Sequence, residues 1–205
     1  MNSARIDLFA EDQAHERLLD PIVKRIAKAE SIGVNIRVRC ARGGHGRAIR
    51  EFEVYQAVAE QVGSSEGLPD LVIVGIDGNC RTFASKRDDI RAATRRTFLD
   101  RLVIACPDPH IERWYMADPQ SFTKVVGTTP TLGTKKCDRD HYKDTLAKTV
   151  RQAGHPATLK GIEFAEELVD ALDLYRAAKN DRSLKAFLDD LRPALRMLRQ
   201  RRIAR

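Results

Sequence analysis

Glu11 and Asp77 are the residues of this sequence whose type and position best suit chemistry. Residues 4–10 (ARIDLFA) precede Glu11, and the largely apolar run 70–76 (DLVIVGI) precedes Asp77. Both segments favour β-strands, and the second has the composition of a strand buried on both faces. Because the carboxyl ends of parallel strands meet at one edge of a sheet, we expect the two carboxylates to lie close together. Carboxylate oxygens are the ligands that Mg²⁺ or Mn²⁺ prefers, so the pair predicts a divalent-metal site.

Other polar residues beside these acids are candidates to complete the site. Asn79 offers an amide oxygen two positions after Asp77, and Gly78 between them allows a tight bend that brings the backbone close to a phosphate. Asp12 and Glu16 are auxiliary acids that follow the first strand. The alternative is that such acids only cap the helices that come next, which is a common use of Asp and Glu at helix starts.

The charge of the chain favours a polyanionic partner. The 205 residues carry a formal net charge of +7, and neutralising phosphates releases counterions whatever the base sequence. We therefore expect DNA or RNA as the partner, with a merely solvated basic surface as the alternative. The candidate nucleic-acid-binding residues are basic positions in a glycine-rich loop, a lysine pair and the C-terminal tail: Arg42, His45, Arg47, Lys135, Lys136, Arg199, Arg201 and Arg202.

Two of these basic segments have a second interpretation. The tail arginines also suit the C-terminal end of a helix, where cations interact favourably with the helix dipole. The loop at residues 42–47 (RGGHGR) lacks the Gly-Lys-Ser/Thr of a Walker A motif, so ATP hydrolysis by this chain is not expected.

Apolar periodicity predicts an α/β fold with a mainly parallel sheet flanked by helices. Strands alternate with helical segments along the first half of the chain, which implies crossover connections. Further strands are expected at 34–40 and 102–106, and helices at 14–29, 48–62, 85–96 and 112–116. After a Gly/Thr/Pro-rich loop at 123–136, helices are expected at 140–153, 161–178 and 183–199. We therefore expect a catalytic core over 1–139 and a helical C-terminal region with a basic tail over 140–205.

The cysteines and the apolar runs indicate a cytoplasmic protein. Cys40, Cys80, Cys106 and Cys137 form no C-x-x-C pair, so a structural zinc site is not expected. The longest apolar run, 71–76, is far too short to cross a bilayer, and the N-terminus lacks the pattern of a secretory signal. We expect no membrane association, and the sequence leaves homo-oligomerisation open.

Three segments resemble landmarks of the Toprim fold in the same order. Residues 5–21 (RIDLFAEDQAHERLLDP) resemble its opening strand and acidic loop, and residues 70–79 (DLVIVGIDGN) resemble its buried strand ending in Asp-x-Asp. Residues 109–122 (PHIERWYMADPQSF) are similar to a third landmark of one branch, the DUF4276-type Toprim-like proteins, which is related to the OLD-family nucleases. Lys135-Lys136 and residues 183–191 (SLKAFLDDL) look similar to the lysine segment and helical C-terminal region of that branch. The resemblance covers nearly the whole chain and implies a Toprim-like Rossmannoid sheet.

The resemblance implies a Mg²⁺- or Mn²⁺-dependent nuclease that hydrolyses phosphodiester bonds of DNA or RNA. It makes Asp77 the principal metal ligand, Glu11 a ligand or general base, and Glu112 a third catalytic acid. Proteins of this branch often accompany an ATPase in bacterial antiviral defence loci, which implies an ATPase partner. His15 and Asn79 stand where the branch has acids, and this departure favours one metal over two. The alternatives are a decayed subunit that binds nucleic acid or the ATPase, and a nucleotidyl transferase on the same fold.

Overall fold

A parallel β-sheet forms the centre of the molecule. The computed structural model describes residues 3–41, 47–133, 135–138 and 140–203, with the backbone alone at 64–66. Within these residues, four parallel strands pair in the order β2-β1-β3-β4. Their bounds are Ala4–Ala10 for β1, Val34–Cys40 for β2, Leu71–Gly75 for β3 and Leu102–Ala105 for β4. The predicted α/β class and the parallel sheet are confirmed.

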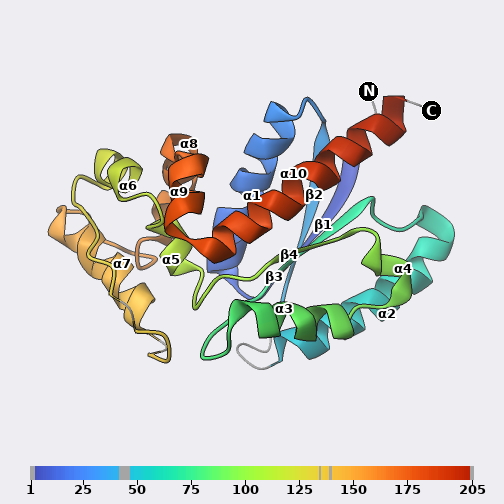
Figure 1. Ribbon diagram of the computed structural model, residues 1–205, viewed down its shortest axis with the longest axis horizontal. Helices are drawn as coiled ribbons and strands as arrows, with labels where there is room; N and C mark the ends of the chain where they lie inside the picture. The colour runs from blue at the N-terminus through green and yellow to red at the C-terminus, as the bar shows by residue number, and fades with distance from the viewer. Residues whose placement is uncertain (1–2, 42–46, 134, 139, 204–205) are drawn as a thin grey trace.

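Helices cover both faces of the sheet (Figure 1). On one face lie α1 (Gln13–Ala29) and the long C-terminal helix α10 (Arg182–Ile203). On the other lie α2 (Ala48–Glu66), α3 (Phe83–Ala92) and α4 (Arg96–Leu99). The remaining helical elements gather at one end of the sheet: α5 (Glu112–Tyr115), α6 (Pro119–Val126), α7 (His141–Gln152), η1 (Ile162–Phe164), α8 (Ala165–Ala171) and α9 (Leu174–Asn180). The result is the three-layered arrangement of a Rossmann-like fold with a helical C-terminal part.

The strand order reverses direction between β1 and β3. The chain passes from β1 outward to β2 by way of α1, then returns through α2 to place β3 on the other side of β1. The loops after β1 and β3 therefore leave the sheet toward opposite faces. Such a reversal opens a crevice beyond the carboxyl ends of the two strands, which is where ligands bind in open α/β sheets.

The C-terminal helices share the hydrophobic core of the sheet. Leu184, Leu188, Leu191 and Leu195 recur along one face of α10 and are buried in the same cluster as Ile6 and Leu8 of β1 and Leu18 and Leu19 of α1. The helical spacing of those leucines is what turns one face of α10 toward the sheet. Of the described helices, none is long and apolar enough to cross a membrane.

Several predicted element boundaries were wrong. Helices α2 and α10 each extend four residues beyond their predicted ends, to Glu66 and Ile203. The segment 123–126, predicted as loop, ends helix α6, which begins with Pro119 at its first position and stops at Gly127 with a left-handed φ of 95°. The helix predicted over 161–178 is interrupted at Leu172, where ψ is 125°, and Asp173 caps a new helix, α9. The helix predicted over 85–96 starts at Phe83, where Thr82 caps it, and ends at Ala92.

Candidate metal centre

Glu11 and Asp77 meet across the ends of β1 and β3. The backbone N–H of Glu11 donates to the carbonyl of Gly75 at 2.8 Å, which continues the pairing of the two strands by one residue. In return, the backbone N–H of Asp77 donates to Oε2 of Glu11 at 2.9 Å. Both residues are buried, with exposures of 7% and 9%. The prediction that these two carboxylates share one edge of the sheet is confirmed, and they stand at the reversal of strand order.

The carboxylate of Asp77 is held by three further groups. Its Oδ1 accepts from the backbone N–H of Ile111 at 2.9 Å, and its Oδ2 lies 3.1 Å from Nδ1 of His110. Nε2 of His15 lies 3.1 Å from Oδ1. Burial alone would raise the pKa of Asp77, but the charge of His15 and the hydrogen bond from His110 lower it below the usual value. Asp77 is therefore ionised in the folded protein at neutral pH.

His15 lies between two carboxylates in the first turn of α1. Asp12 caps this helix by accepting from the backbone N–H of His15 at 3.1 Å, and the same oxygen lies 2.8 Å from Nδ1 of the ring. The imidazole is completely buried. Burial would lower the pKa of His15, but the charge of Asp77 and the hydrogen bond with Asp12 raise it well above the usual value. The contact with His15 also lowers the pKa of Asp12 to about 2, against the effect of burial.

Glu11, His15 and Asp77 form a group able to hold a metal ion. One ligand atom from each residue lies within 4.8 Å of the others. Nε2 of His15 faces Asp77 at an ion-pair distance, yet this buried nitrogen has no hydrogen-bond partner of suitable geometry among the described residues. Two carboxylate oxygens suit a divalent cation. Nε2 of His15 can become a third ligand only when the ring is neutral, and that nitrogen shifts the preference from Mg²⁺ toward Mn²⁺ and later transition metals.

Gly75 in β3 has no side chain, which allows α1 to pack close to the strand beside the site. A Cβ atom at Gly75 would lie 2.6 Å from Cδ1 of Leu19 and 3.4 Å from Cδ2 of His15. A larger residue at this position would therefore require the end of the Leu19 side chain to move. The backbone N–H of Gly78 donates to the carbonyl of Pro107 at 2.8 Å, and a Cβ at Gly78 would lie 2.9 Å from that oxygen.

Glu112 is a buried acid beside this group. It begins α5, just after Ile111 and His110, which both hold Asp77. Its exposure is only 7%. Burial and then the charge of Asp77 raise the pKa of Glu112. Among the described residues, its carboxylate has no donor other than its own backbone N–H. The structure thus places the third predicted acid next to Asp77, in an environment that favours its protonated form.

Asn79 does not join the group. Its side-chain amide donates to the backbone carbonyl of Asp77 at 3.1 Å, and its backbone N–H donates to Pro109 at 2.9 Å. With a φ of 57°, it adopts the left-handed conformation that Asn tolerates better than most residues. Asn79 therefore shapes the loop after β3, and His15 supplies the third atom of the metal group.

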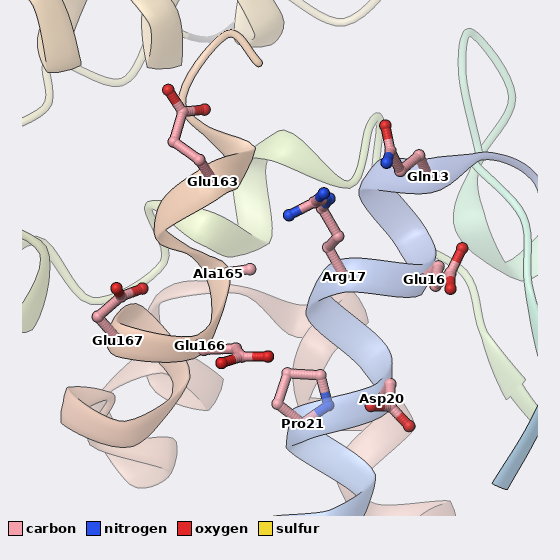
Figure 2. A pocket seen from close by; sticks show the side chains of 9 residues that line it. All are labelled: Gln13, Glu16, Arg17, Asp20, Pro21, Glu163, Ala165, Glu166 and Glu167. Atoms are coloured by element: carbon pink, nitrogen blue, oxygen red, sulfur yellow. The ribbon is translucent and has the colours of Figure 1, made fainter. Parts of the chain in front are cut away.

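Glu16 faces an acidic pocket next to the candidate centre. Figure 2 shows this pocket of about 400 Å³ between α1 and α8, with Arg17 pointing into the space between the two helices. Glu16 also accepts from the thiol of Cys40 at 3.1 Å. The acidic residues among those that line the pocket are Glu16, Asp20, Glu163, Glu166 and Glu167. An acidic lining disfavours anions in this pocket.

The predicted basic residues that the structure describes lie at two opposite ends of the sheet, the carboxyl ends of the strands and their amino ends. Arg47 is exposed just before α2, and Lys135 is 67% exposed. Nζ of Lys136 lies 2.7 Å from Oδ1 of Asp108, a residue that follows β4. The lysine pair therefore lies at the carboxyl ends of the strands, called here the carboxyl edge, where Glu11 and Asp77 also lie. Arg42 and His45 lie outside the described residues.

The arginine tail reaches the other edge. Nη2 of Arg202 donates to Oδ2 of Asp70 at 2.8 Å, and Asp70 lies just before β3. Nη1 of Arg199 donates to the backbone carbonyl of Glu30 at 3.1 Å, and Glu30 lies just after α1. Both contacts lie at the amino ends of the strands. Arg201 is exposed beside them near the end of α10. The structure therefore separates these three arginines from the candidate centre, and their contacts fasten the end of α10 to the body of the protein.

Two histidines of the site were missed by sequence reasoning. The resembled family has an acid at position 15, and for this reason His15 was not predicted as a site residue. In the structure the imidazole of His15 lies between the carboxylates of Asp12 and Asp77. The signal was present: in Asp12-x-x-His15 the side chain three positions after a helix cap points back toward the cap. His110 had no such local signal, because its position depends on the path of the loop after β4.

Comparison of the chain with protein-family models, with curated proteins and with solved structures finds no match. The interpretation of the centre therefore depends on its geometry and on the resemblance of its short motifs.

Proposed function

We propose that the chain is a divalent-cation-dependent phosphodiesterase that cleaves nucleic acid. The observation that carries this proposal is the convergence of Glu11, His15 and Asp77 at the reversal of strand order, with ligand atoms within 4.8 Å of one another. Glu112 beside them supplies a group that can exchange a proton. The net charge of +7 suits a polyphosphate substrate.

Each residue has a distinct role in this proposal. Asp77 and Glu11 provide the negative charge that holds the cation, and the backbone bond between them fixes their separation. His15 adds a nitrogen ligand once its proton has left, and His110 and Ile111 orient the carboxylate of Asp77. The bound cation would neutralise charge on the phosphate during attack by water. Glu112, with its raised pKa, is the general acid–base group that gives or takes the proton of the leaving or attacking oxygen.

The ligand types favour Mn²⁺ over Mg²⁺ at this centre. Mg²⁺ is bound almost entirely by oxygen, whereas an imidazole is an ordinary ligand for the transition metals. We therefore propose Mn²⁺ as the better activator and Mg²⁺ as the weaker one. The choice between DNA and RNA, and the ATPase partner implied by the motif resemblance, are left to the same assays.

A second candidate function is binding without catalysis. It is favoured by one observation: protonated His15 already lies between Asp12 and Asp77, where it neutralises both carboxylates without a metal. In this case the centre is a structural remnant, and the chain binds nucleic acid or a partner protein through its basic carboxyl edge.

One set of assays separates the two candidates. Purified protein is incubated with plasmid DNA, single-stranded DNA and RNA in the presence of Mn²⁺, Mg²⁺ or EDTA, and Mn²⁺ binding is measured in parallel by calorimetry. We expect cleavage with Mn²⁺ that EDTA abolishes and that is lost in Asp77→Asn. The control is Asp88→Asn, which changes an acid of α3 whose side chain is 75% exposed. Salt-sensitive binding that survives Asp77→Asn, without Mn²⁺ binding or turnover, would exclude the nuclease and support the second candidate.

A further inference from the structure

Two exposed thiols meet at the carboxyl edge of the sheet. Cys80 follows the loop that carries Asp77, and Cys137 belongs to the segment 135–138. Both cysteines are exposed, and the neighbouring thiol of Cys137 raises the pKa of Cys80. Neither thiol has a part in the proposed metal centre.

Independent contacts bring the two segments together. The backbone N–H of Asn79 donates to the carbonyl of Pro109 at 2.9 Å. Lys136 lies 2.7 Å from the carboxylate of Asp108, the residue before that proline. The residues that precede Cys80 and Cys137 are thus anchored to adjacent positions of one loop, which brings the two cysteine-bearing segments together.

The other two cysteines have different surroundings. The thiol of Cys40 donates to Glu16 at 3.1 Å, and burial together with that carboxylate raises the pKa of Cys40 to about 12. Cys106 is buried, and burial raises its pKa to about 12 as well. Thiols held in the protonated form react slowly with oxidants, because the thiolate is the nucleophile. Contact with Cys137 raises the pKa of Cys80 as well, so acidity does not single out this thiol. What distinguishes the Cys80–Cys137 pair is that both thiols are exposed and that they neighbour each other.

We propose that Cys80 and Cys137 are a redox modification site, at which a hydroperoxide converts the two thiols into an intramolecular disulfide. The product joins the loop after β3 to the segment 135–138. Accessible cysteines with a neighbouring resolving thiol are the ones that undergo this reaction in proteins.

The chemistry balances with hydrogen peroxide as oxidant. Cys137, which follows Lys136, attacks one peroxide oxygen as the thiolate; the O–O bond breaks and hydroxide leaves, giving a sulfenic acid. The sulfur of Cys80 then attacks the sulfur of Cys137, the S–O bond breaks, and the departing hydroxide takes the Cys80 proton as water. In sum, two thiols and one hydrogen peroxide give one disulfide and two waters. Both sulfurs are oxidised and the peroxide is reduced.

The disulfide would have two consequences. It closes a loop between positions that are far apart in the chain, which restricts the unfolded state and stabilises the fold. It also fixes the segment carrying Lys135 and Lys136 beside the edge where Glu11 and Asp77 lie. An effect on cleavage rests on the proposed function, whereas formation of the disulfide does not.

The test treats dilute, reduced full-length protein with stoichiometric hydrogen peroxide and measures its intact mass. We expect a decrease equal to two hydrogen atoms, reversed by dithiothreitol, and a Cys80–Cys137 linkage in peptides mapped without reduction. Cys80→Ser and Cys137→Ser should each abolish the decrease, and Cys40→Ser, the matched exposed control, should leave it unchanged. The thermal unfolding midpoint should rise on oxidation of the wild type and of Cys40→Ser only.

Several results would overturn the proposal. They are a mass gain of oxygen atoms without a disulfide, a linkage that involves Cys40 or a second molecule, and a mass decrease that persists in Cys137→Ser. The assay contains neither metal nor nucleic acid, so its failure leaves the proposed nuclease activity untouched. A failure of cleavage likewise leaves the disulfide untouched.

Discussion

The backbone N–H of Asp77 donates a hydrogen bond to the carboxylate of Glu11 at 2.9 Å, and this bond joins the ends of β1 and β3. It gives Glu11 a structural function in addition to the proposed chemical one. The two functions can be separated with Glu11→Gln, which keeps the acceptor oxygen, and Glu11→Ala, which removes it.

Glu11→Gln and Glu11→Ala should differ in stability but not in metal binding. The amide oxygen of Gln can accept from Asp77, so the free energy of unfolding should change by less than about 1 kcal/mol, whereas Ala leaves a buried N–H unpaired at a cost of about 1–3 kcal/mol. Both replacements remove the charge, so both should lose Mn²⁺ binding. Chemical denaturation and calorimetry measure the two effects. Equal destabilisation by the two variants would contradict the structural role of the bond.

Asp77→Asn should abolish stabilisation by metal. A ligand that binds only the folded state raises its stability by an amount that grows with ligand concentration, about 2.7 kcal/mol at 100 times the dissociation constant. We expect Mn²⁺ to raise the unfolding midpoint of the wild type and of Asp88→Asn. Asp77→Asn should show no such rise, and its cleavage rate should fall by on the order of 100-fold or more. A midpoint shift that persists in Asp77→Asn would place the cation elsewhere.

Glu112→Gln should lower activity without lowering stability. Its carboxylate is buried without a neighbouring donor side chain among the described residues, and burial with the charge of Asp77 raises its pKa. Removing an unfavourable buried charge should leave the free energy of unfolding unchanged or raise it. The cleavage rate should fall by roughly 10²–10⁴-fold if Glu112 is the acid–base group. Chemical denaturation measures the stability of the variant, and single-turnover kinetics on the same preparation measures its cleavage rate. Full activity in Glu112→Gln would show that Glu112 is not the acid–base group.

Asp118 should make stability depend on acid pH. Arg176 bonds its carboxylate at 2.9 Å and Ser121 at 2.6 Å, and although burial opposes ionisation these contacts lower the pKa of Asp118 to about 2. Because this pKa lies below the unfolded value of about 3.9, the stabilisation is complete above about pH 4 and is lost as the pH falls toward 2.

The matching variant is Asp118→Asn. At neutral pH it should be less stable than the wild type by about 2 kcal/mol, the usual value of hydrogen bonds to a charged group. The difference should shrink as the pH falls through the window in which Asp118 takes up its proton. Urea denaturation along a pH series measures it, and a difference that stays constant down to about pH 2 would argue against the ion pair.

The two groups of basic residues should differ in their effect on nucleic-acid binding. Lys135 and Lys136 lie on the edge of the candidate centre, so Lys135→Ala and Lys136→Ala should weaken binding, each reducing the slope of log affinity against log salt by about 0.9 for a lost phosphate contact. Arg199→Ala and Arg202→Ala should mainly destabilise the end of α10, because these side chains bond Glu30 and Asp70. Filter binding at several salt concentrations, combined with thermal unfolding, distinguishes the outcomes. If only the arginine variants lost binding, the nucleic acid would bind near the end of α10 and not at the edge that carries Lys135 and Lys136.

The sequence carried enough information for the sheet and for the central pair of acids. Strand β1 leads into Glu11 and the apolar strand β3 leads toward Asp77. Parallel strands bring their carboxyl ends together, so the proximity of Glu11 and Asp77 could be predicted. The role of His15 was within reach through its spacing from Asp12. It was missed because position 15 was compared with an acidic motif and not with the geometry of a helix start.

Other features depend on tertiary contacts that have no local pattern. His110 and Ile111 reach Asp77 because the loop after β4 turns back over the end of β3. The location of Arg199 and Arg202 depends on the direction in which α10 crosses the sheet, which helical periodicity does not specify. The interruption at Leu172 was hidden because the apolar spacing continues across it.

Gly75 has a consequence for the surroundings of His15. A Cβ atom there would lie 2.6 Å from Cδ1 of Leu19 and 3.4 Å from Cδ2 of His15. An added methyl group would therefore displace the flexible end of Leu19 and touch the imidazole at ordinary van der Waals distance. The side of the candidate centre nearest β3 is thus formed by the backbone of the strand and not by a side chain.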